Sequence, residues 1–269
     1  RSGRPDMLRQ RIFSAVIAAV LLFVVLFALP ETAARLVIVA VILTAAWEWA
    51  GLLSLASPVA RSGYTMLVAG LIGLVFIALA TPWAREGVLL AALAWWVAAL
   101  VWLRLYPTPV PAAVAWFVGI MVLVPAWVAL DFLYRVEPAL LLFMLVVVWA
   151  ADIGAYFSGK TFGRVKLAPS ISPGKTWEGV IGGLLLVLVL VVLRGYWAGD
   201  NLAVLVPFCV AVALLSVVGD LTVSIFKRNA GVKDSGKLFP GHGGLLDRID
   251  SVTAASPLFA LGVLWFGVR

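Results

Sequence analysis

Long apolar runs separated by short polar turns dominate the hydropathy pattern of this chain. The runs are continuous and lack the period-two alternation that marks the strands of a membrane barrel. A helix needs about 20 mostly apolar residues to cross a bilayer. We therefore expect about nine membrane-spanning helices, at roughly 12–30, 34–55, 64–81, 87–103, 110–130, 138–157, 178–196, 201–225 and 251–268.

Composition supports the same fold class. Hydrophobic residues make up 64% of the chain and charged residues 12%, whereas soluble domains average about 45–50% and 25%. Backbone groups in lipid must find their hydrogen-bond partners within the protein, which leaves helices and closed barrels as the only spanning structures. The sequence predicts an all-α, polytopic integral membrane protein.

The sequence has two long polar loops, 158–177 and 227–250, and both lie in its C-terminal half. We expect N-terminal transmembrane helices over 1–136 and a C-terminal transmembrane catalytic region over 137–269. Of the 20 Lys and Arg residues, 15 fall on the side of the long loops and the N-terminus. The positive-inside rule places this side in the cytoplasm and the C-terminus outside. The net charge of +7 is explained by these loops and by anionic lipid headgroups.

Charged side chains within spans are energetically costly, so each of them needs an explanation. Glu48 is expected to serve as a hydrogen-bond partner inside the helix bundle. Asp152 is followed at helical spacing by Tyr156 and Lys160, which places the three on one face. The single cysteine, Cys209, excludes an intrachain disulfide.

Asp220 begins a second polar stripe at the end of a span. Ser224, Lys227 and Arg228 follow it at offsets of four, seven and eight, so all four share one helical face. A helix end with snorkelling cations would explain Lys227 and Arg228. It explains a carboxylate at position 220 poorly, which favours a functional stripe.

The first long loop carries Ser172, Gly174, Lys175 and Thr176 just before a helix. An ordinary basic cytoplasmic loop would account for the charge alone. Glycines, hydroxyls and a helix N-terminus also suit phosphate binding. The spacing differs from that of a P-loop.

The second loop has the densest chemistry in the chain. Its charged and turn-forming residues include Lys233, Asp234, His242, Gly243, Gly244, Asp247, Arg248 and Asp250. Asp247 and Asp250 are three apart, so they share a face if the last helix begins there. Carboxylates suit Mg²⁺, which takes one or two of them together with substrate phosphates. A lone histidine without nearby cysteines argues against zinc. Acids for a metal and cations for phosphate, at a membrane surface, indicate phosphoryl transfer on a lipid.

Residues 224–250 resemble the signature of the phosphatidate cytidylyltransferases, the CDP-diacylglycerol synthases. The matching positions are Ser224, Lys227, Arg228, Lys233, Asp234, Pro240, His242, Gly243, Gly244, Asp247, Arg248 and Asp250. The segment 172–178 is similar to the first cytoplasmic motif of the family, although Gly174 stands where a second Lys is frequent. The first five spans are similar in hydropathy only.

The resemblance implies transfer of CMP from CTP to phosphatidic acid, giving CDP-diacylglycerol and pyrophosphate for phospholipid biosynthesis. It implies Mg²⁺, as one or two ions, with Asp220, Asp247 and Asp250 as metal ligands. Asp220, Asp247, Lys227 and Arg228 are the expected catalytic residues. The expected substrate-binding residues are Ser224, Lys233, Asp234, His242, Gly243, Gly244, Arg248, Ser172, Lys175, Thr176 and Tyr156.

The expected partners are CTP, phosphatidic acid and membrane lipids, with a second copy of the chain as a candidate partner and no nucleic acid. The expected location is the cell inner (cytoplasmic) membrane, with the active site facing the cytoplasm. Two alternatives stay open. A CTP-dependent lipid-alcohol kinase would use similar residues, and an ion-coupled transporter would also carry intramembrane acids.

Overall fold

A computed structural model of the chain describes residues 4–53, 55, 57–79, 81–236, 238 and 243–267, without the side chains of 4–15 and 82. Within these residues it has nine α-helices and one two-stranded antiparallel ribbon. The elements are α1 Arg4–Phe27, α2 Glu31–Leu52, α3 Pro58–Ala78, α4 Pro82–Leu105, α5 Ala112–Val136, α6 Pro138–Phe162, β1 Lys166–Ala168, β2 Ser172–Thr176, α7 Trp177–Ala198, α8 Leu202–Asn229 and α9 Leu246–Phe266. The all-α, polytopic prediction is confirmed.

Eight of the helices, α2 to α9, are long and apolar enough to cross a membrane. For α1, the part whose side chains are described is the apolar segment Val16–Phe27. The ribbon of β1 and β2 lies inside the first long loop and was not predicted. Its strands are too short to give a hydropathy signal of their own.

Several helices continue beyond the apolar runs that predicted them. α6 extends to Phe162 rather than 157, α8 to Asn229 rather than 225, and α9 begins at Leu246 rather than 251. Hydropathy marks the part of a helix that lies in lipid, whereas backbone hydrogen bonding continues into the polar residues beyond. The two polar loops are consequently shorter than expected, and their outer residues belong to helices.

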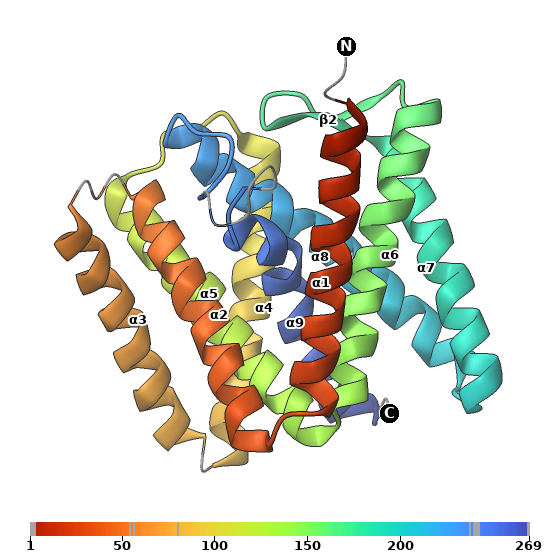
Figure 1. Cartoon of the computed structure of the whole chain (residues 1–269), viewed down its shortest axis with the longest axis horizontal. Helices are drawn as coiled ribbons and strands as arrows, with labels where there is room; N and C mark the ends of the chain where they lie inside the picture. The colour runs from red at the N-terminus through yellow and green to blue at the C-terminus, as the bar shows by residue number, and fades with distance from the viewer. Residues whose placement is uncertain are drawn as a thin grey trace.

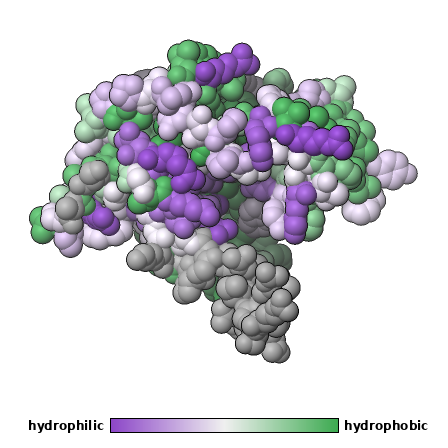
Figure 2. All heavy atoms as spheres, turned by 90° about the horizontal axis from the view of Figure 1, so that it is seen from above, coloured by the Kyte–Doolittle hydropathy of each residue, from purple (hydrophilic) through white to green (hydrophobic). Residues whose placement is uncertain are grey.

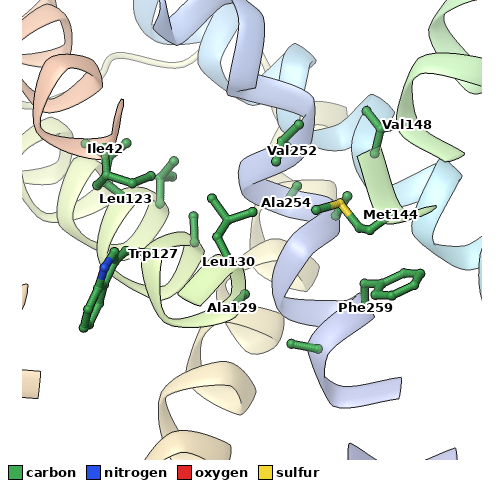
Figure 3. Packing of buried hydrophobic residues seen from close by; sticks show 14 of the residues in the cluster. Ile42, Leu123, Trp127, Ala129, Leu130, Met144, Val148, Val252, Ala254 and Phe259 are labelled. Atoms are coloured by element: carbon green, nitrogen blue, oxygen red, sulfur yellow. The ribbon is translucent and has the colours of Figure 1, made fainter. Parts of the chain in front are cut away.

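The helices run side by side, and α1 begins at the end of the bundle that carries the ribbon, the end of α8 and the start of α9 (Figure 1). We call this end the loop end. α9 packs against α2, α4, α5, α6 and α8, so it joins the two halves of the sequence. Figure 3 shows this core, where Ile42 of α2 and Leu123 and Leu130 of α5 lie on one side of Val252 and Met144 and Val148 of α6 on the other.

Glycines bring α6 and α7 into close contact. A Cβ atom on Gly154 would lie 2.6 Å from the Gly182 carbonyl oxygen and 2.8 Å from Gly183 Cα. Such distances leave no space for a side chain, so the two backbones touch directly. Because β1 and β2 connect α6 to α7, this contact fixes the base of the ribbon.

Hydrophilic side chains gather on the loop end, where Figure 2 shows them spread across the centre of the face. Apolar side chains show more towards the margins of the same view. The loop end is thus a polar surface at one end of an apolar bundle.

Candidate active site at the loop end

Lys175 of β2 and Asp220 of α8 form an ion pair that joins the ribbon to the bundle. Lys175 Nζ lies 2.5 Å from Asp220 Oδ2, and both side chains are about a quarter exposed. Asp220 Oδ1 also accepts a hydrogen bond from Ser224 Oγ, at 3.2 Å. Asp220 and Ser224 therefore share a helical face, as their spacing predicted.

Lys227 of α8 meets two carboxylates at the start of α9. Its Nζ lies 2.7 Å from Asp247 Oδ1 and 3.6 Å from Asp250 Oδ2. Both acids stand on the first turns of α9, as their separation of three predicted. All three side chains are at most 10% exposed, and removing one partner from such a buried group would leave an uncompensated charge.

Asp247 is held by backbone groups as well as by Lys227. Its Oδ2 accepts hydrogen bonds from Ser235 N at 2.8 Å and from Gly244 N at 2.9 Å. Gly243 has φ +82°, and a Cβ atom there would lie 2.7 Å from Asp247 Oδ2. The glycine is thus required both by its left-handed backbone and by its contact with the carboxylate.

These side chains and Asp152 form one electrostatic unit. Asp152 interacts with both Asp220 and Lys175, and Asp250 interacts with Asp220, Lys227 and Lys175. We call Asp152, Asp220, Asp247, Asp250, Lys175 and Lys227 the carboxylate–lysine cluster. The cluster holds four carboxyl groups and two ammonium groups, so it offers more oxygen donors than its own lysines occupy.

The cluster does not form a complete metal site from protein groups alone. Among the described residues, no three carboxylate, imidazole or thiolate groups are placed to hold one ion together. Mg²⁺ usually takes only one or two carboxylates and fills its remaining positions with water and phosphate oxygens. The carboxylate donors therefore fit an ion that is bound together with a phosphate-bearing substrate.

Three of the predicted site residues have structural contacts of their own. Arg228 donates from Nε to the Ile171 carbonyl and from Nη1 to the Val232 carbonyl, both at 3.1 Å, so it ties the ribbon to the end of α8. Thr176 is buried and caps α7 by accepting from Gly179 N at 3.1 Å. Tyr156 is exposed on α6, with Lys160 Nζ 5.6 Å from its ring centroid.

A pocket of about 560 Å³ opens beside the second loop. Lys233 and Asp234 line it together with Trp47 and Glu48 of α2 and Arg61 of α3. Sequence reasoning missed Arg61, because nothing near it in sequence has a functional pattern. Among the other predicted residues, Ser172 lies in β2 and Arg248 on the first turn of α9, whereas His242 lies outside the described residues.

Glu48 has a more specific position than the sequence indicated. The expectation of a hydrogen-bonded structural partner is confirmed, since its carboxylate accepts from Leu245 N at 3.0 Å, Leu246 N at 2.8 Å and Ser235 Oγ at 3.0 Å. These groups belong to the second loop and the first turn of α9. Their partner is contributed by the N-terminal half, about 200 residues away in sequence.

Comparison with known proteins identifies the family of the chain. Residues 9–266 match the cytidylyltransferase family. A phosphatidate cytidylyltransferase of Pseudomonas aeruginosa is 43% identical over 268 residues, which cover 96% of this chain and 97% of the relative. One from Haemophilus influenzae is 38% identical, covering 94% and 98%. One from Brucella suis is 47% identical over 128 residues, 45% of each chain. The chain therefore belongs to the cytidylyltransferase family.

Proposed function

We propose that the protein transfers CMP from CTP to phosphatidic acid, releasing pyrophosphate and forming CDP-diacylglycerol. The observation that carries this proposal is the carboxylate–lysine cluster at the loop end, which combines cations for phosphates with carboxylates for a metal at a membrane surface. Family membership, with relatives named for this activity, supports the same reaction. The product supplies phospholipid biosynthesis.

The reaction needs little from a protein base. The nucleophile is a phosphate oxygen of phosphatidic acid, which is largely ionised near pH 7 because the second pKa of a phosphate monoester is about 6. This oxygen attacks the α-phosphorus of CTP, and the bond from that phosphorus to the β-phosphate oxygen breaks. The protein must neutralise the phosphates and hold them in line.

We assign this work to the C-terminal region, residues 137–269. Lys175 and Lys227 are ammonium donors that carboxylates now hold in place, and substrate phosphates can compete for both. Arg228 acts through the ribbon that it fixes. Lys233 and Asp234 line the pocket, and we assign them to contact with the nucleotide. Gly243 and Gly244 set the backbone that faces Asp247.

We assign the metal to Mg²⁺, as one or two ions, with ligands drawn from Asp220, Asp247 and Asp250; these three described side chains do not hold the same ion by themselves. When bound, the ion supplies charge neutralisation at the reacting phosphates. The protein holds these carboxylates in place. Ser224 and Lys175 fix Asp220, and two backbone amides fix Asp247. This fixed geometry is what in-line transfer requires.

The loop end is assigned to the cytoplasm and the bundle to the bacterial inner membrane. The distribution of basic residues supports this orientation, and CTP is a cytoplasmic reactant. The expected homodimer stays a prediction, and the mass of the purified protein in detergent measures it.

Isotope transfer tests the reaction. Purified protein with phosphatidic acid, Mg²⁺ and CTP labelled at the α-phosphate should give labelled lipid, whereas label at the γ-phosphate should appear in pyrophosphate. Passage of γ-label into a lipid alcohol would instead establish the lipid-kinase alternative. The transporter alternative is disfavoured, because the cluster lies at one end of the bundle rather than at the midplane, where transporter sites lie.

A further inference from the structure

We propose that Glu48 is a positioning residue for the reaction: it clamps Ser235 of the second loop to the start of α9 so that Asp247 keeps its place beside Lys227. The effect on activity rests on the proposed function. The restraint of Asp247 rests on the contacts of Glu48 alone. Glu48 lies on α2, outside the signature segment 224–250, and is buried at 6% exposure.

The clamp consists of three hydrogen bonds from two separate stretches of chain. Oε1 accepts from Leu245 N, and Oε2 accepts from Leu246 N and from Ser235 Oγ. Leu245 N and Leu246 N lie at the N-terminus of α9, where backbone amides have no carbonyl partner within the helix. A carboxylate there is favoured by the partial positive charge of the helix end as well as by the bonds themselves.

Ser235 connects the clamp to the cluster. Its hydroxyl donates to Glu48, while its backbone N donates to Asp247 Oδ2 at 2.8 Å. Asp247 directly follows Leu246 in the chain, so the carboxylate of Glu48 also restrains the backbone of Asp247. Glu48 therefore restrains Asp247 from both sides without touching it.

Two glycines make room for this carboxylate. A Cβ atom on Gly236 would lie 2.3 Å from Glu48 Oε1, and the three nearest atoms that it would meet all belong to Glu48. A Cβ atom on Gly244 would lie 2.3 Å from Glu48 Oε2. Gly244 was expected to bind substrate, but Glu48 occupies the space that a side chain at position 244 would need. The bare backbone at both positions is thus explained by the clamp.

The test is Glu48→Gln, which keeps the size of the side chain. An amide presents one acceptor where the carboxylate presents two, so its NH₂ group must face a backbone N–H donor. We expect faster hydrogen exchange in a peptide covering 243–250. We also expect kcat to fall roughly 10- to 10²-fold, since a displacement of about 1 Å can cost about 10²-fold. Ser235→Ala, which removes one bond of the three, should have a smaller effect in both measurements.

The matched control is Asp131→Asn. Asp131 is a buried acid of the same half, paired with Arg35 through a 2.6 Å contact. It should lower thermal stability while leaving kcat and exchange over 243–250 unchanged. If Glu48→Gln behaves like this control, its role is structural only and the proposal is wrong. Exchange is measured without substrate, so it reports on the clamp even if the isotope assay overturns the proposed reaction.

Gly236→Ala provides a second, independent check. Alone it should lower kcat, because its methyl group collides with Glu48. In a Glu48→Ala background the collision is removed, so Gly236→Ala should have little further effect. Full additivity of the two substitutions would contradict the contact on which the proposal depends.

Discussion

Lys175 and Asp220 lie 2.5 Å apart although they come from different parts of the fold, one from the ribbon between α6 and α7 and the other from α8. The pair thus closes the first long loop onto the helix that begins the signature segment. A charge-assisted bond of this kind is strong when it is partly shielded from water. It places an ammonium group beside the carboxylates that are the proposed metal ligands.

Lys175→Ala should raise KM for CTP about tenfold or more, because a hydrogen bond to a charged group contributes about 1.5–3 kcal/mol and about 1.4 kcal/mol corresponds to tenfold. Steady-state kinetics with varied CTP measure the change. Lys166→Ala is the control, since Lys166 is an exposed cation of the same ribbon. Equal effects of the two substitutions would mean that only the overall charge of the ribbon matters.

Asp220→Asn and Asp247→Asn should each lower kcat at least about 10²-fold, by comparison with the loss of one transition-state charge stabiliser. The double substitution should cost less than the product of the two, because both acids serve one cluster. Asp250→Asn should be milder, since Lys227 keeps its 2.7 Å bond to Asp247. Activity titrated against Mg²⁺ provides the measurement. Near-normal activity of Asp220→Asn with unchanged Mg²⁺ dependence would remove this residue from the ligand set.

Gly154→Ala should destabilise the fold by about 1–3 kcal/mol, the usual range for overpacking, because its methyl group would meet the backbone of α7. Gly73→Ala is the matched control in α3, where a Cβ atom meets nothing within 4 Å. Thermal unfolding in one detergent compares the two variants. A similar loss in both would show that glycine flexibility, not the contact between α6 and α7, limits stability.

Single cysteines can establish the orientation of the bundle. In a Cys209→Ser background, Lys166→Cys should be protected from an impermeant thiol reagent added to intact cells, whereas Ala198→Cys should react. Both side chains are exposed; Lys166 lies in β1, in the ribbon before α7, and Ala198 is the last residue of α7. Labelling at position 166 from outside would reverse the orientation and the proposed route of CTP.

Hydropathy and helical spacing predicted much of this molecule. The nine helices and the shared faces of Asp220 with Ser224 and of Asp247 with Asp250 follow from local periodicity, which depends only on neighbours in sequence. The spacing of Arg228 placed it on the stripe of Asp220. Its long side chain instead reaches Ile171 of the ribbon, because helical spacing fixes the Cα position and not the end of a flexible side chain.

Other contacts could not be predicted, because they depend on how helices pack. The bond between Glu48 and Leu246 spans 198 residues, and the pair of Lys175 and Asp220 requires a ribbon that hydropathy did not reveal. Position 48 gave one signal, a carboxylate inside an apolar run. That signal indicates a partner without identifying it.

The distance in sequence between Glu48 and its donors has a consequence for how the protein is made. In a chain that enters the membrane from its N-terminal side, α2 is inserted well before Ser235, Leu245 and Leu246 have been synthesised. During that interval the carboxylate has none of its final partners, and leaving it without hydrogen bonds in lipid would be costly. The nascent α2 must therefore keep Glu48 in contact with water or with the insertion machinery until α9 arrives. The arrival of α9 then shelters that acid and, in the same step, completes the proposed catalytic centre.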